Sequence, residues 1–135
     1  MHRCEWCGTD PLYVSYHDNE WGVPEYSSQC LWEKLVLDGF QAGLSWLTIL
    51  KRRENYRKAY LNFDPVKVAK FDDSMVEELM NNSGVIRNRR KIESSISNAR
   101  LFLDVQKEYG SFNNYFRSFL PKAGIINEFN SLAEL

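Results

Sequence analysis

The chain has 135 residues, enough for one domain with a sizeable hydrophobic core. Charged residues make up 26% and the formal net charge is −1, so no global basic field points to a nucleic-acid partner. No apolar run reaches the ~18–20 residues that a membrane-spanning helix needs, and the first residues lack the apolar core of a signal peptide. We therefore predict one cytoplasmic domain over residues 1–135, with no membrane partner. The three cysteines argue against a disulfide framework.

Residues 1–26 are crowded with aromatic and possible metal-binding side chains but show no helical periodicity. Gly8, Pro11, Gly22 and Pro24 interrupt them, which favours loops and short turns. Because so many aromatic rings are costly to leave in water, we expect this segment to pack across the rest of the molecule.

Apolar residues recur at helical spacing through most of the remaining chain, and no convincing pair of strands is present. The pattern predicts an all-α fold with helices over about 28–38, 45–61, 65–71, 73–80, 91–109 and 112–120. Ser27 or Ser28 is the predicted cap of the first of these helices, and Cys30 is predicted to be a buried small residue within it. Gly84 is predicted to end the helix that finishes near residue 80. The tail from residue 122 is weakly patterned.

Residues 35–46 form the stretch around which the chain is organised. They run from one predicted helix, through a loop framed by Gly39 and Gly43, to the start of the next helix. Such a loop can hold the carboxylate of Asp38 and the flat face of Trp46 around a small planar ligand. The alternative is a plain helix–helix connection with Trp46 in the core.

Positive charge is concentrated in two places despite the near-neutral total. Residues 51–58 carry five basic side chains, and Arg87, Arg89, Arg90 and Lys91 follow a predicted turn between two helices. Such a hairpin exposes backbone N–H groups at a helix start, where the helix dipole favours an anion. The clusters predict a grip on nucleic-acid phosphates, with solvated helix faces as the alternative.

Cys4 and Cys7 have the spacing of half a zinc site, and His17 is a further possible ligand. No second Cys-x-x-Cys and no downstream pair of histidines is present, so these residues alone do not build a closed four-ligand site. A thioredoxin-like redox site would need a βαβ context, which the pattern does not predict.

Several blocks of this sequence resemble the bacterial 3-methyladenine DNA glycosylase I family, within the helix-hairpin-helix DNA glycosylases. The two longest blocks are Tyr16-His17-Asp18-Asn19-Glu20-Trp21-Gly22-Val23-Pro24 and Gln41-Ala42-Gly43-Leu44-Ser45-Trp46. Shorter blocks lie at 3–4, 10–13, 53–56, 63–65, 68–69, 86–89 and 91–92. The resemblance therefore covers the chain from about residue 3 to its end.

The resemblance implies a helix-hairpin-helix bundle with a loop-rich aromatic N-terminal segment. It implies a DNA repair enzyme, expected to be a monomer, that hydrolyses the N-glycosidic bond of 3-methyladenine in alkylated double-stranded DNA. The family's base pocket carries over onto Tyr13, Tyr16, Trp21 and Trp46, with Asp38 as the catalytic residue. The family is usually described with Glu at position 38, and Asp is one methylene shorter. The Asp that follows the hairpin in the wider superfamily has no counterpart here, a departure that this family shares.

The resemblance also implies which residues meet DNA. Leu44 is the candidate wedge into the base stack, with Gln41 beside it. The hairpin residues that match the family's grip on the DNA backbone are Arg87, Arg89, Arg90 and Lys91.

In that family Cys4 and His17 match two of the four ligands of a structural zinc. The other two, a His and a Cys, belong to a later stretch that this chain does not contain. The chain therefore resembles a C-terminally truncated member with an incomplete zinc site. Two alternatives stay open: an inactive fragment that retains at most DNA binding, and a metal-binding module with no role on DNA.

Overall fold

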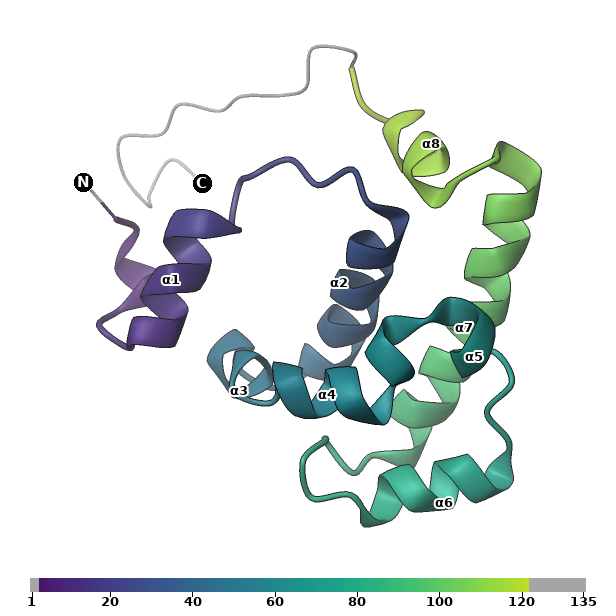
Figure 1. Cartoon of the computed structure of the whole chain (residues 1–135). Coiled ribbons are helices and arrows are strands. Elements are labelled where there is room, and N and C mark those ends of the chain that lie inside the picture. The colour runs from purple at the N-terminus through teal and green to yellow at the C-terminus, as the bar shows by residue number, and fades with distance from the viewer. Residues whose placement is uncertain (1–2, 122–135) are drawn as a thin grey trace.

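The computed structural model describes residues 3–121, and every regular element in that part of the chain is a helix (Figure 1). In chain order the elements are η1 Glu5–Cys7, α1 Pro11–Asn19, α2 Ser28–Gln41, α3 Trp46–Leu50, α4 Arg53–Ala59, η2 Leu61–Phe63, α5 Pro65–Val68, α6 Asp73–Asn81, α7 Arg89–Tyr109 and α8 Phe112–Arg117. The predicted all-α class is confirmed, and the tail from residue 122 lies outside the described residues. Between residues 3 and 121, no helix has the length and apolar character needed to cross a membrane.

The core lies where the long helix α7 packs against α2, α5 and α6, with α8 against its far end (Figure 1). Its largest fully buried side chains include Trp32, Tyr56, Tyr60, Phe40, Phe63 and Ile92. The Tyr60 hydroxyl donates to Ser95 Oγ at 3.0 Å, and Ser95 in turn donates to the Ile92 carbonyl at 2.7 Å. The core therefore holds its hydroxyl groups in hydrogen bonds, as buried polar groups require.

Residues 11–19, predicted as loops and turns, form α1. The Asp10 carboxylate accepts the Leu12 N–H at 3.0 Å, and Pro11 occupies the first helical position, where its missing N–H costs nothing. The prediction failed because the apolar side chains of α1 are spread around the helix instead of lining one face. α1 packs against α3 and η1, at the edge of the molecule away from α7 (Figure 1).

The start of α2 is set by a capping residue and its end by the burial of an aromatic side chain. The Ser27 hydroxyl accepts the Cys30 N–H at 3.3 Å, so the predicted cap at Ser27 is confirmed. Cys30 itself is exposed, which corrects its predicted burial. The helix also continues through Gly39 to Gln41, because Phe40 is buried and keeps the last turn on the core. The loop that follows is therefore shorter than predicted.

The predicted helix over 45–61 is two helices joined by a turn at residues 51–52. Ser45 caps α3 by accepting the Thr48 N–H at 3.1 Å. The turn lets α3 bury Ile49 and Leu50 while α4 buries Tyr56. In one straight helix these side chains could not all point into the core from a single face, so tertiary packing overrode the sequence pattern here.

The hairpin between α6 and α7 is fixed by side chains that bond its backbone. The Asn82 carboxamide oxygen accepts the Gly84 N–H at 2.8 Å, and the Tyr56 hydroxyl accepts the Ile86 N–H at 3.0 Å. Asn88 caps α7 through the Lys91 N–H at 3.2 Å. The helix-hairpin-helix pattern is therefore present and is anchored to α4.

Gly84 has a different role from the predicted helix cap, because α6 ends earlier, with Asn82 as its C-cap. A Cβ built on Gly84 would lie 2.9 Å from Cβ of Asn55, closer than such atoms approach in real structures. Glycine is needed here so that the hairpin can approach α4.

We expect Gly84→Ala to lower the free energy of unfolding by about 1–3 kcal/mol, because the extra methyl group must push the hairpin away from Asn55. Gly39→Ala is the matched control. Gly39 lies inside α2, and beyond its chain neighbours and the backbone of its own helix nothing lies within 4 Å of the added Cβ, so this change should raise stability by about 0.5–1 kcal/mol. Urea unfolding measures both values. Equal effects of the two changes would contradict the close approach at Gly84.

Candidate functional site

The four aromatic residues predicted to bind the base lie in one cluster. Tyr16 of α1 and Trp46 of α3 are in contact, with ring centroids 5.5 Å apart. Tyr13 lies 6.5 Å from Tyr16, and Trp6 stands between Tyr13 at 5.1 Å and Trp21 at 5.3 Å. The contact between α1 and α3 thus brings together rings that are far apart in the sequence.

The members of this cluster differ in exposure. Tyr16 and Trp46 are each 8% exposed, so much of both rings also serves the core, as the plain alternative for Trp46 predicts. The Trp46 indole Nε1 is buried with no hydrogen-bond partner among residues 3–121, a donor that a ligand could satisfy. Trp21 is 48% exposed and stacks on His17 at 5.6 Å. The cluster therefore reaches from the core to the surface.

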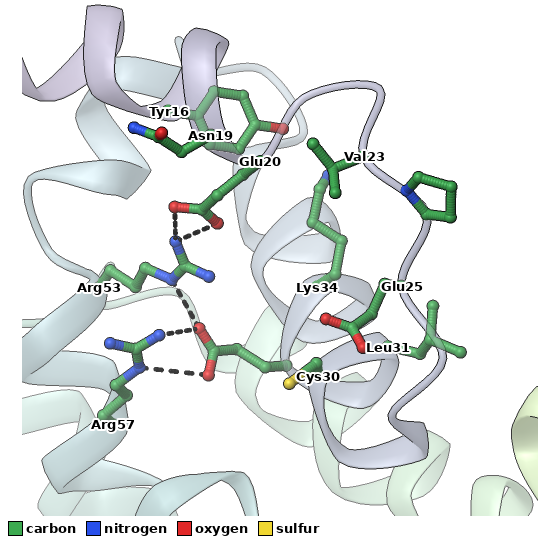
Figure 2. Close-up of a pocket in the computed structure, with 12 residues that line it drawn as sticks. Tyr16, Asn19, Glu20, Val23, Glu25, Cys30, Leu31, Lys34, Arg53 and Arg57 are labelled. Carbon is green, nitrogen blue, oxygen red and sulfur yellow. Dashed lines mark hydrogen bonds and ion pairs between the residues drawn. The ribbon is translucent and has the colours of Figure 1, made fainter.

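A cavity of about 270 Å³ opens beside Tyr16, between the end of α1, the loop that follows it, α2 and α4 (Figure 2). The residues that line it are Tyr16, Asn19, Glu20, Val23, Pro24, Glu25, Cys30, Leu31, Glu33, Lys34, Arg53 and Arg57. This volume is close to the lower end of the range for small-molecule sites. Of the predicted base-binding residues only Tyr16 lines the cavity.

Charged side chains close one side of this cavity (Figure 2). Arg53 donates to Glu20 at 2.7 and 2.9 Å and to Glu33 at 2.6 Å, and Arg57 donates to Glu33 at 2.9 and 3.2 Å. Burial acts to raise the pKa of Glu33, but the hydrogen bonds from Arg57 and Arg53 outweigh it and leave the pKa below its usual value. The network therefore stays ionised and ties α1, α2 and α4 together.

Asp38, the predicted catalytic residue, lies on the outer face of α2 with its side chain 46% exposed. It forms an ion pair with Lys34, one helical turn earlier, and the Lys34 ammonium lies 4.3 Å from the Trp46 ring centroid. Burial raises the pKa of Tyr16, and the negative charges of Asp38 and Glu20 raise it further. Asp38 is thus within electrostatic range of Tyr16, and Lys34 links it to both the indole and the cavity.

The basic residues of the hairpin divide into two groups. Arg87 and Arg90 are exposed and form no ion pair within residues 3–121. Arg89 pairs with Glu77, and its Nη1 lies 3.8 Å from Glu93. The hairpin therefore presents two cations to solvent.

Lys91 is turned into the protein and ties the hairpin to the end of α2. Its ammonium donates to the Phe40 carbonyl at 2.8 Å and to the Ala42 carbonyl at 2.5 Å. The adjoining loop carries Leu44, which is 39% exposed. The Leu44 N–H donates to the backbone carbonyl of the half-buried Gln41 at 2.6 Å. The hairpin and the predicted wedge are thereby joined.

Cys4 and His17, the predicted zinc ligands, lie side by side. His17 Nδ1 is 2.9 Å from the Asp18 carboxylate, which only accepts hydrogen bonds, so Nδ1 carries the proton. Nε2 is then an acceptor and takes the Cys4 backbone N–H at 3.2 Å. This tautomer suits a metal ligand oriented by a carboxylate. Within residues 3–121, however, no three His, Cys, Asp or Glu side chains gather closely enough to hold a metal.

Three residues of the site were not singled out from the sequence. Trp6 joins the aromatic cluster, and nothing in its local pattern separates it from the other aromatic residues of the N-terminal segment. Arg53 lies in a basic cluster and its partners come from distant helices. Lys34 could have been found, because its spacing of four residues from Asp38 on a predicted helix places the two charges on one face.

Comparison with known proteins gives a consistent result. The family model described as methyladenine glycosylase matches residues 6–135. DNA-3-methyladenine glycosylase 1 of Escherichia coli (strain K12) is 47% identical over 135 residues, which are 100% of this chain and 72% of that protein. A crystal structure of 3-methyladenine DNA glycosylase I superposes with a TM-score of 0.95 at 47% identity, covering 99% of this chain and 74% of that one.

A further solved structure holds the base itself. It is a tyrosine-to-phenylalanine variant of 3-methyladenine DNA glycosylase I in complex with 3-methyladenine, with a TM-score of 0.84 at 38% identity, covering 87% of this chain and 63% of that one. The family match, the identity and the shared helical fold agree along nearly the whole chain. This chain therefore belongs to the methyladenine glycosylase family.

Proposed function

We propose that this protein is a DNA glycosylase that hydrolyses the N-glycosidic bond of 3-methyladenine in alkylated DNA. The observation that carries the proposal is the arrangement of a carboxylate and an aromatic face around one positive charge, with Asp38 and Trp46 both in contact with the ammonium of Lys34. Lys34 also lines the cavity that Tyr16 borders. Family membership supplies the substrate class.

The chemistry follows from the charge of the base. Methylation at N3 makes the base a cation, so the glycosidic bond is already weak and the base leaves as a neutral molecule. The enzyme must flip the base out of the stack and hold it. The faces of Trp46 and Tyr16 attract a cation by ~0.5–2 kcal/mol. Asp38 accepts a hydrogen bond from the exocyclic amine, and water adds to the sugar carbon as oxocarbenium-like character develops.

On the DNA side we propose that Arg87 and Arg90 contact phosphates while Leu44 enters the base stack. Arg89 and Lys91 hold the hairpin in place through their partners within the protein. We propose that the protein acts on DNA as a monomer. Because the proposed substrate is DNA, we also propose a cytoplasmic location.

We expect Asp38→Asn to lower release of 3-methyladenine from methylated DNA by about 10- to 100-fold, because a hydrogen bond to a charged group contributes ~1.5–3 kcal/mol. Chromatography of the freed bases measures this release. Asp104→Asn, at an exposed position of α7, is the control and should leave release unchanged. If the parent protein binds DNA but frees no base, the inactive-fragment alternative replaces this proposal.

Replacing either Arg87 or Arg90 with alanine should weaken DNA binding for every sequence alike. The slope of log affinity against log salt concentration should fall in magnitude by about 0.9 for each phosphate that the variant no longer neutralises. Lys107→Ala, in the last turn of α7, removes an equal charge far from the hairpin and should leave the slope unchanged. Equal slopes for all three variants would refute a phosphate grip at the hairpin.

We also propose that Cys4 and His17 are two of the four ligands of a structural zinc, as the family resemblance implies. The support is the contact between the two residues and the tautomer of His17. In metal analysis of the protein purified with added zinc, Cys4→Ala should retain less zinc than Cys30→Ala, which changes an exposed thiol. Equal zinc content in both variants would contradict this assignment.

A further inference from the structure

Lys34 occupies a position at which a positively charged base would be attracted by both a carboxylate and an aromatic ring. Its ammonium pairs with Asp38 and lies 4.3 Å from the Trp46 ring centroid. The same side chain lines the cavity beside Tyr16, and Figure 2 shows it extending from α2 along that cavity toward Val23. An aromatic face and a carboxylate are the two groups that attract a cation, and here one lysine uses both.

This arrangement makes the resting site electrically balanced. With Lys34 in place, the charge of Asp38 is offset by one ammonium from within the chain. A second cation cannot share the Trp46 face and the carboxylate without crowding the first, since like charges repel at this range. A cationic base that takes up both contacts must therefore displace the ammonium.

The side chain has room to move away. Lys34 is 45% exposed, and no other carboxylate pairs with it among residues 3–121. A long, flexible lysine can move its charged end into water while its methylene groups stay on the protein. Displacement thus exchanges one cation for another beside Asp38 and leaves no ammonium buried.

We propose that Lys34 is an internal cation that yields its place to the charged base and reclaims it after the glycosidic bond breaks. This inference rests on the proposed glycosylase function. When the bond between the base and the sugar carbon breaks, its electron pair stays with the base, so the base becomes neutral. Water adds to the sugar carbon and releases a proton to solvent. The neutral base competes poorly with an ammonium for Asp38, so Lys34 favours its departure.

The direct test compares two probes of nearly equal shape. The 3,9-dimethyladeninium ion carries a fixed positive charge, and 9-methyladenine is neutral. Calorimetric titration of the full chain with each probe gives the affinity of the parent, Lys34→Met and Lys34→Arg proteins. Lys70→Met, at an exposed lysine with no ion pair among the described residues, is the matched control.

We expect Lys34→Met to bind the cationic probe about 3- to 30-fold more tightly than the parent, because the competing cation is gone. The neutral probe should gain less, Lys34→Arg should resemble the parent, and Lys70→Met should change nothing. In turnover, free 3-methyladenine should inhibit Lys34→Met more strongly than the parent.

An unchanged or weaker affinity of Lys34→Met for the cation overturns the inference, and so does an equal gain for both probes. Lys34→Arg keeps the charge, so a difference between the two variants reports on the charge and not on folding; the melting temperature of each variant verifies this. Base release by the parent is measured separately. If the parent frees base while Lys34→Met binds the cation no better, the proposed function stands and only the role of Lys34 fails.

Discussion

The site depends on the guanidinium of Arg53, which joins the N-terminal helix α1 to the helical body. It donates hydrogen bonds to Glu20, just after the end of α1, and to the half-buried Glu33 of α2. Glu33 also accepts a hydrogen bond from Arg57. α1 packs away from the α7 core and brings Tyr16 to Trp46. Removing one partner from a partly buried ion pair leaves the other charge unpaired, which costs more than the pair itself contributes. The aromatic cluster is therefore held by charge at one end and by ring contact at the other.

The base site and the hairpin share one helix, α2. Lys34 and Asp38 both project from this helix, and Lys91 at the start of α7 donates a hydrogen bond to the Phe40 carbonyl near its end. The hairpin is therefore tied to the end of α2 by two hydrogen bonds that Lys91 donates, and to α4 by the close approach of Gly84 to Asn55. The same lysine that the sequence presents as a phosphate contact thus acts here as a structural link.

The fold class, the long helix α7 and the cap at Ser27 were predictable, because periodicity and capping residues are local signals. α1 was not, since its apolar side chains show no single face. The contact of Tyr16 with Trp46 and the inward turn of Lys91 depend on packing between distant segments, which no local pattern encodes. The resemblance named the site residues, but it could not show that Lys34 stands between Asp38 and Trp46.

Recognition by charge explains why so little catalytic machinery surrounds this cavity. A base that carries its own positive charge leaves without a proton donor, so the protein needs an attractive face and a counter-ion more than a strong acid or base. A carboxylate beside an aromatic face attracts any cation, however, and its negative charge would be unpaired when no base is bound. A lysine one turn away on the same helix satisfies the carboxylate at rest, and Asp38, shorter than the usual glutamate, stays on the helix surface where that lysine can reach it. The requirement for a charged substrate and the presence of a built-in cation are thus two consequences of one carboxylate.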